Sequence, residues 1–269
     1  MILIRSAIFQ VVFYATFIAL MIAGLPCLML PRAATMALVR LWARVSVWLL
    51  AVICGLKIEF RNLHLLPKGA SILAVKHQSF LETFALITVL DDYAYVLKKE
   101  LTALPFFGWY AKAAEQIGID RDKRAATLSG LQRRVREKLA QARQVVIFPE
   151  GTRRPIGAPP VYKPGVAALV ADSQVSCTPV ALNSGLFWPR RSFMRRPGTV
   201  VIEFLPAIPP GLDKRAFMKT LQAAIEPATD ALVANAIAAD RRLEEVVAQQ
   251  LVRARTTDKT SDSPAPARA

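Results

Sequence analysis

Two residues with acid–base side chains lie five positions apart in the stretch 74–84, AVKHQSFLETF. His77 is one of only two histidines in the 269 residues, and Glu82 follows where a helix is expected to begin. Ser79 and Glu82 have capping-box spacing, which would turn the Glu82 carboxylate back toward the loop that holds His77. A carboxylate that accepts from one imidazole nitrogen leaves the other free to take a proton from a hydroxyl group. The pair therefore predicts general-base chemistry.

The same residues have a structural explanation, which the sequence leaves open. Serine and glutamate at this spacing are common at helix starts, so Glu82 could serve only as a cap and His77 could be a loop histidine bonded to backbone. The other histidine, His64, lies among leucines with no carboxylate at a useful spacing. We interpret His64 as structural.

A second group of polar residues directly follows the apolar run 145–148. The turn carries Glu150, Gly151, Thr152 and Arg153. Loops at the C-terminal ends of strands are where open α/β sheets bind ligands. Glycine permits close backbone approach, and a guanidinium binds phosphate in a bidentate manner. We predict a phosphate-binding turn here, with a solvated basic loop as the alternative.

The elements that must position these residues alternate along the chain. Strands are predicted at 71–75, 93–97, 117–119, 145–148, 178–182 and 199–204, and helices at 79–90, 124–143, 164–172 and 213–255, the last with a break at Pro227. This alternation predicts an α/β fold, a mostly parallel mixed sheet flanked by helices, in one domain over residues 57–255. Residues 256–269 lack the apolar residues that a folded segment needs and are expected to be disordered.

Residues 1–56 are predicted to be a membrane anchor. Between Ser6 and Leu30, 25 residues carry no charge. As a helix they would reach about 37 Å, enough to span the hydrocarbon layer, although Pro26 would end or kink the helix. The second apolar run, 45–56, has only 12 residues, which suggests a short re-entrant or interfacial helix. The arginines between the two runs do not assign an orientation.

The charge balance predicts an anionic partner. The chain has 35 Lys and Arg against 20 Asp and Glu, a formal charge of +15. Beside an apolar anchor this excess favours an anionic bilayer over nucleic acid, for which no binding motif is present. The three cysteines, Cys27, Cys54 and Cys177, form neither a disulfide framework nor a metal-ligand cluster, and they indicate a reducing compartment.

His77 with a carboxylate at the fifth following position, and FPEGTR about 70 residues later, resemble the glycerolipid acyltransferase family over residues 71–182. The best-known members are the 1-acyl-glycerol-3-phosphate acyltransferases. The resemblance implies that His77 is the general base and Glu82 its orienting acid. It implies a substrate-binding role for the residues that match the family's other blocks: Arg121, Glu150, Gly151, Thr152, Arg153 and Lys163. Pro179 corresponds to the proline of the last block.

The implied activity is transfer of a fatty acyl group from acyl-CoA or acyl carrier protein to the free hydroxyl of 1-acyl-glycerol-3-phosphate, forming phosphatidate. The acyl donor is a substrate, so no cofactor and no metal are expected. The expected partners are membrane lipid and acyl carrier protein, without nucleic acid. The expected location is the inner membrane, with the catalytic domain facing the cytoplasm.

Three positions depart from the family pattern, and the acceptor stays open. Glu82 stands where the family usually has Asp, Lys76 where it has Asn, and Glu115 where it often has Gly. The alternatives are the same chemistry on a lyso-aminolipid, such as lyso-ornithine lipid, or on glycerol-3-phosphate. An alternative of another class is a non-catalytic lipid-binding membrane protein.

Overall fold

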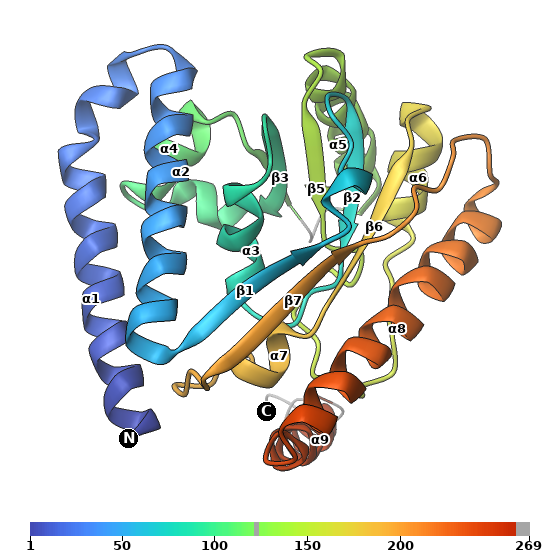
Figure 1. The fold of residues 1–269 in the computed structure, drawn as a ribbon. Helices are drawn as coiled ribbons and strands as arrows, with labels where there is room; N and C mark the ends of the chain where they lie inside the picture. The colour runs from blue at the N-terminus through green and yellow to red at the C-terminus, as the bar shows by residue number, and fades with distance from the viewer. Residues whose placement is uncertain (121–123, 262–269) are drawn as a thin grey trace, which may run out of the picture.

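The computed structural model describes residues 1–120 and 124–261. Within these residues seven strands form one sheet in the order β1-β7-β6-β2-β5-β3-β4 (Figure 1). All neighbouring pairs are parallel except β6 and β7. The strands are β1 Leu56–Arg61, β2 Ser71–Val75, β3 Tyr93–Lys98, β4 Ile117–Ile119, β5 Gln144–Ile147, β6 Cys177–Leu182 and β7 Gly198–Phe204. The predicted α/β fold with a mostly parallel mixed sheet is confirmed.

Helices cover both faces of the sheet (Figure 1). The α-helices are α1 Ile2–Ala23, α2 Arg32–Leu49, α3 Leu81–Ala85, α4 Phe107–Ala113, α5 Arg124–Ala140, α6 Gly165–Ser173, α7 Ser184–Phe187, α8 Lys214–Ala239 and α9 Leu243–Ser261. Short helical turns add η1 Leu25–Met29, η2 Leu50–Cys54, η3 Leu63–Leu65, η4 Leu86–Thr88 and η5 Lys99–Ala103. The connections place the C-terminal ends of β2 and β5 side by side, because these two strands pair in the sheet.

Strand β2 is a central strand whose sequence is apolar from Ile72 to Val75. All five residues are buried, and they alternate between two cores. Leu73 and Val75 pack into the cluster that contains α1, α2 and α3, whereas Ile72 and Ala74 pack into the cluster that contains α5, α6 and the first half of α8. A central strand that is covered on both faces needs apolar side chains at every position.

Strand β1 is an element that the sequence did not predict. Its residues LKIEFR alternate between buried or partly buried and more exposed positions, and the run follows the apolar segment directly. We had placed its first residue in the anchor. β1 pairs with β7 in parallel at the edge of the sheet, so it ties the N-terminal helices to the domain.

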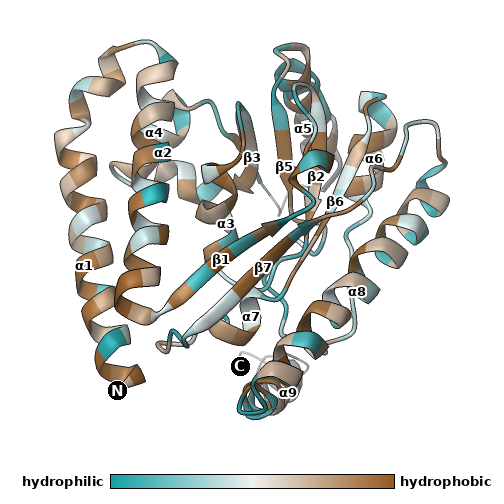
Figure 2. Cartoon of the chain, in the orientation of Figure 1, coloured by the Kyte–Doolittle hydropathy of each residue, from teal (hydrophilic) through white to brown (hydrophobic). Residues whose placement is uncertain are grey.

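The N-terminal region forms two long apolar helices rather than one long and one short helix. Residues Ile2–Ala23 and Arg32–Cys54 are both long and apolar enough to cross a membrane by length and composition. The short second helix that we predicted is wrong in length, because counting only uncharged residues excluded the turns that carry Arg40 and Arg44. Both helices are mostly hydrophobic and stand together beside the sheet (Figure 2). The first helix buries only a few residues, Phe9 and Phe13 among them.

Polar contacts fix α2 to the end of the sheet. Arg32 forms a bidentate ion pair with Asp92, at 2.8 and 2.6 Å between nitrogen and oxygen. The fully buried Arg143 donates to the same carboxylate and to Glu115. Arg40 donates to the backbone carbonyls that precede Asp92. Helix α2 is therefore held to the domain by an ion pair and hydrogen bonds as well as by apolar packing.

The C-terminal helices differ from the prediction in where the chain bends. Helix α8 continues through Pro227 to Ala239, and the break falls at Asp240, whose carboxylate accepts from the Arg242 N–H. A break is expected at Pro227 because proline removes a helical hydrogen bond; in the structure the helix continues, with Ile225 and Thr229 buried on either side of the proline. Helix α9 ends at Ser261, beyond the predicted start of the tail at residue 256, and residues 262–269 lie outside the described part of the chain.

Candidate active site

The loop after β2 places His77 beside Glu82. His77 Nδ1 lies 2.9 Å from Glu82 Oε1, and the Glu82 side chain is completely buried while His77 keeps a small exposed fraction. Glu82 lies in the first turn of α3, whose start at Leu81 is two residues later than predicted. The predicted contact between the two side chains is therefore present in the structure.

Backbone hydrogen bonds fix the Glu82 carboxylate and the tautomer of the imidazole. Oε1 accepts from the N–H groups of Gln78 and Ser79, at 2.8 and 2.7 Å, and Oε2 accepts from Ser184 Oγ at 2.8 Å. An oxygen that already accepts two N–H groups cannot donate, so His77 Nδ1 carries the proton in this contact. Nε2 is left as the basic nitrogen. The predicted capping box is half formed. The Ser79 N–H donates to Glu82 Oε1, but Ser79 Oγ accepts from the N–H of Leu81 rather than from that of Glu82.

The turn after β5 supports the His77 loop from the other side. The Phe148 ring stacks on the His77 ring, with centroids 3.9 Å apart and planes 22° apart. Glu150 Oε2 accepts from the His77 backbone N–H at 3.1 Å, and the His77 carbonyl accepts from the Arg154 N–H at 2.8 Å. Gly151 has φ +65°, the left-handed region that glycine adopts without strain. The two predicted motifs thus meet, because β2 and β5 are neighbours.

Glu150 points into the protein rather than toward solvent. Its side chain is fully buried and forms an ion pair with Lys76, which in turn contacts Glu226 on α8. Burial raises the pKa of the Glu150 carboxyl, whereas the Lys76 ammonium and the His77 N–H oppose that rise. Glu150 was predicted to bind substrate, and the structure gives its two carboxylate oxygens to Lys76 and to the His77 backbone.

The remaining predicted residues differ in whether they reach the cavity that His77 lines. Arg153 lines the same cavity as His77. Thr152 and Lys163 are exposed, and the Lys163 side chain passes against Gly151, where an added Cβ would meet Lys163 Cγ at 3.4 Å. Arg121 lies outside the described residues.

Further arginines gather near Arg153. The guanidinium of Arg190 donates to the Arg153 carbonyl at 3.1 Å, and that of Arg154 donates to the Pro159 carbonyl at 3.0 Å. Burial lowers the pKa of Arg190, and the charges of Arg191, Arg153 and Arg154 lower it further. Positive charge concentrated in this way favours an anion.

Glu115, which replaces the family's frequent glycine, adopts a backbone conformation that glycine prefers. Its φ is +53°, a value that is uncommon for residues with a Cβ. The Glu115 carboxylate pairs with Lys138 and with the buried Arg143. The glutamate therefore has a structural role away from His77.

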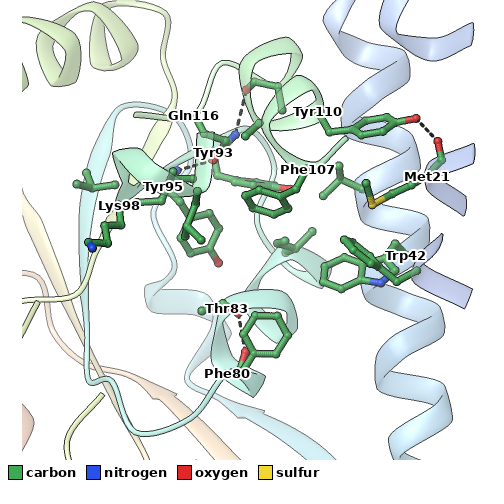
Figure 3. A pocket seen from close by; sticks show the side chains of 18 of the residues that line it. Met21, Trp42, Phe80, Thr83, Tyr93, Tyr95, Lys98, Phe107, Tyr110 and Gln116 are labelled. Carbon is green, nitrogen blue, oxygen red and sulfur yellow. Dashed lines mark hydrogen bonds between the residues drawn. The ribbon is translucent and has the colours of Figure 1, made fainter. Parts of the chain in front are cut away.

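A cavity of about 350 Å³ opens from His77 toward the N-terminal helices. Figure 3 shows Phe80 and Thr83 at one end and Tyr110 at the other, where Tyr110 Oη donates to the Met21 carbonyl at 2.6 Å. Most of the lining is aliphatic or aromatic, and α1, α2, α3, β3 and α4 all contribute to it. The volume and lining are those of a small-molecule site with room for an apolar chain.

Sequence reasoning did not find three residues that complete the site. Ser184 bonds to Glu82, while Glu226 and Tyr162 form one hydrogen-bonded group with Lys76. Ser184 and Glu226 are 102 and 150 residues distant from their partners along the chain. The one available signal was Lys76 itself, since a lysine that ends a buried strand needs a carboxylate partner.

Comparison with known proteins shows the family of the chain. The acyltransferase family model matches residues 57–183. The chain is 36% identical over 177 residues to a 1-acyl-sn-glycerol-3-phosphate acyltransferase of Pseudomonas aeruginosa. The matched region covers 66% of this chain and 69% of that protein. A protein of the same name from Helicobacter pylori is 34% identical over 120 residues, 42% of this chain and 48% of that protein. The chain spans less than half of this second relative.

A solved structure shows the same fold. The crystal structure of the 1-acyl-sn-glycerophosphate acyltransferase of Thermotoga maritima matches with a TM-score of 0.71 and 20% identity, over 86% of this chain and 98% of that one. The family model and the Pseudomonas aeruginosa relative place the chain among the O-acyltransferases. Within that class, the chain belongs to the acyltransferase family.

Proposed function

We propose that the chain transfers a fatty acyl group from acyl-CoA or acyl carrier protein to the free hydroxyl of 1-acyl-glycerol-3-phosphate and so forms phosphatidate. The observation that carries the proposal is that one apolar cavity is lined both by His77, held by Glu82, and by Arg153. A base, a phosphate-binding cation and space for an alkyl chain are the three features that this acceptor requires. The names of the bacterial relatives support the same acceptor.

The proposed mechanism uses His77 as a general base. Nε2 removes the proton from the acceptor hydroxyl while the hydroxyl oxygen attacks the thioester carbonyl carbon. The tetrahedral intermediate expels the thiolate, which takes the proton from the imidazolium. An ester and a free thiol are the products. The Glu82 carboxylate stabilises the imidazolium that forms between the two steps, so no resident cofactor or metal is needed.

The phosphate of the acceptor is proposed to lie at the arginines beside the site. Arg153 reaches the cavity, and the hydrogen bonds of Arg154 and Arg190 go to backbone carbonyls rather than to carboxylates. A dianionic phosphate would offset the repulsion among these cations. This cluster favours a phosphate-bearing acceptor over a lyso-aminolipid.

The apolar helices are proposed to hold the enzyme in the inner membrane, with the sheet on the cytoplasmic side. Most of the surface of α1 is apolar and exposed, as at Ile4, Val11 and Ile18. Since α1 and α2 also line the cavity, a lipid tail could reach His77 without leaving an apolar environment. Anionic lipid would attract the +15 chain as well.

A panel of acceptors tests the proposed reaction. We expect purified full-length protein in mixed micelles to acylate 1-acyl-glycerol-3-phosphate with labelled acyl thioester, and to do so with a higher kcat/KM than lyso-ornithine lipid or glycerol-3-phosphate. A preference for either of the other two acceptors would replace the proposed substrate and keep the chemistry. Absence of transfer to every acceptor, together with retained lipid binding, would favour the non-catalytic alternative.

The cavity predicts a dependence on acyl-chain length. Ala111 in α4 is buried and lines the cavity. In Ala111→Phe the ring would take up part of the cavity, so we expect kcat/KM for a palmitoyl thioester to fall about tenfold relative to a lauroyl thioester, because the longer chain loses buried methylene groups. Competition between the two thioesters measures the ratio. An unchanged ratio would show that the acyl chain lies elsewhere.

A further inference from the structure

A buried group of charged side chains contacts the loop that carries His77. Lys76 Nζ lies 2.9 Å from Glu150 Oε1, and 2.8 and 2.9 Å from the two carboxylate oxygens of Glu226. Tyr162 Oη donates to Glu226 Oε1 at 2.6 Å. The Lys76 and Glu150 side chains are 5% and 0% exposed, and Glu226 is 19% exposed. This group joins the end of β2, the turn after β5 and the middle of α8.

The two oxygens of Glu150 have different partners. Oε1 accepts from the Lys76 ammonium, and Oε2 accepts from the backbone N–H of His77. One carboxylate therefore connects a buried cation to the residue that carries the proposed base. Hydrogen bonds to a charged acceptor are shorter and stronger than those to a neutral one. The hydrogen bond from the His77 N–H to Glu150 is therefore strongest while Glu150 is ionised.

The charge of Glu150 depends on its neighbours. Burial raises the pKa of the carboxyl and Glu226 raises it as well, while Lys76 and the His77 N–H lower it. Among the described residues, the ionisable groups that face Glu150 are Lys76 and Glu226, with Tyr162 behind them on Glu226. Lys76 is the one cation of this set. Without it, the pKa of a buried carboxyl beside a second carboxylate would rise further.

We propose that Lys76, held by Glu226 of α8, is a positioning residue that keeps Glu150 ionised so that Glu150 fixes the backbone of His77. This inference rests on the proposed role of His77 as the base. It gives Glu150 an inward-facing function in place of direct substrate contact. It also assigns a role to α8, which lies outside the residues matched by the family model.

The pH dependence of Lys76→Met tests the inference. Methionine keeps the length of the side chain and removes its charge. We expect kcat at neutral pH to fall about 10- to 100-fold, because a small displacement of a catalytic group costs this much. We expect kcat to recover as the pH rises and Glu150 ionises, so the rising limb of the pH profile moves to higher pH. Lys68→Met, a matched change of an exposed lysine just before β2, is expected to leave the profile in place.

Two further variants separate charge from packing. Lys76→Met combined with Glu226→Gln removes the repulsion between the two carboxylates, so we expect the rising limb to return toward that of the parent. Glu150→Gln is neutral at every pH, so we expect the loss at neutral pH without recovery at alkaline pH. Thermal unfolding of the purified protein shows whether Lys76→Met folds. If it does not, the pH profile of Glu150→Gln alone tests the positioning role.

The possible results distinguish this inference from the proposed function. A Lys76→Met profile with the parent's rising limb, or a Glu150→Gln variant with the parent's kcat, would overturn the positioning role while leaving His77 as the base. Full activity of His77→Ala would instead remove the proposed role of His77 as the base, and with it the reason for positioning its backbone. Absence of acyl transfer in the parent protein would remove the proposed function itself.

Discussion

Replacing His77 by alanine is expected to lower kcat for acyl transfer by about 10²–10⁴-fold, the range that a positioned general base contributes. The variant removes Nε2, the nitrogen proposed to take the hydroxyl proton. The fold should persist, because Glu82 keeps three other hydrogen bonds, from Gln78, Ser79 and Ser184. Initial rates with purified protein and saturating acyl thioester measure the effect.

His64 offers a matched control for this substitution. It is the other histidine of the chain, and it lies exposed in the short turn η3. We expect His64→Ala to keep the parent's kcat, and both variants to bind vesicles as the parent does, since neither touches α1 or α2. A loss of less than tenfold in His77→Ala would show that another group removes the proton.

Replacing Glu82 by glutamine is expected to lower kcat about 100- to 1,000-fold and to leave KM for the acceptor unchanged. The amide oxygen can take the place of Oε1, which accepts two backbone N–H groups, so the ring orientation and tautomer of His77 should be retained. What is lost is the negative charge beside the imidazolium, and a charge pair at about 4 Å and intermediate dielectric is worth about 4 kcal/mol. The separate measurement of kcat and KM distinguishes this effect from weaker lipid binding.

Ser184→Ala provides the graded comparison for Glu82→Gln. It removes one hydrogen bond to Oε2 and keeps the charge, so the expected loss is about fivefold, equivalent to about 1 kcal/mol. Equal losses in the two variants would mean that orientation rather than charge is the contribution of Glu82. A rise in KM with unchanged kcat would place Glu82 in acceptor binding instead.

Much of the fold was open to prediction from the sequence because its signals are local. Strand β2 is buried at all five positions and apolar from Ile72 to Val75, since both faces are covered, and its bounds agree with the prediction. The helix after it was recognised in the stretch that contains Ser79 and Glu82, although it begins at Leu81. Elements whose pattern was interrupted were misjudged: arginines on α2 hid its length, and Pro227 suggested a break that the structure does not have.

The sequence by itself determined the two motifs and the alternation of strands and helices, and their residue types were enough to indicate a base and a phosphate-binding turn. Only the tertiary structure decided that these motifs meet, since β2 and β5 pair across about 70 residues of chain. It alone turned Glu150 inward to Lys76 and brought Glu226 to the same point from 150 residues away. The physical reason is that periodicity and capping depend on neighbours in the chain, whereas a buried charge finds its partner through the order of the strands and the packing of a distant helix.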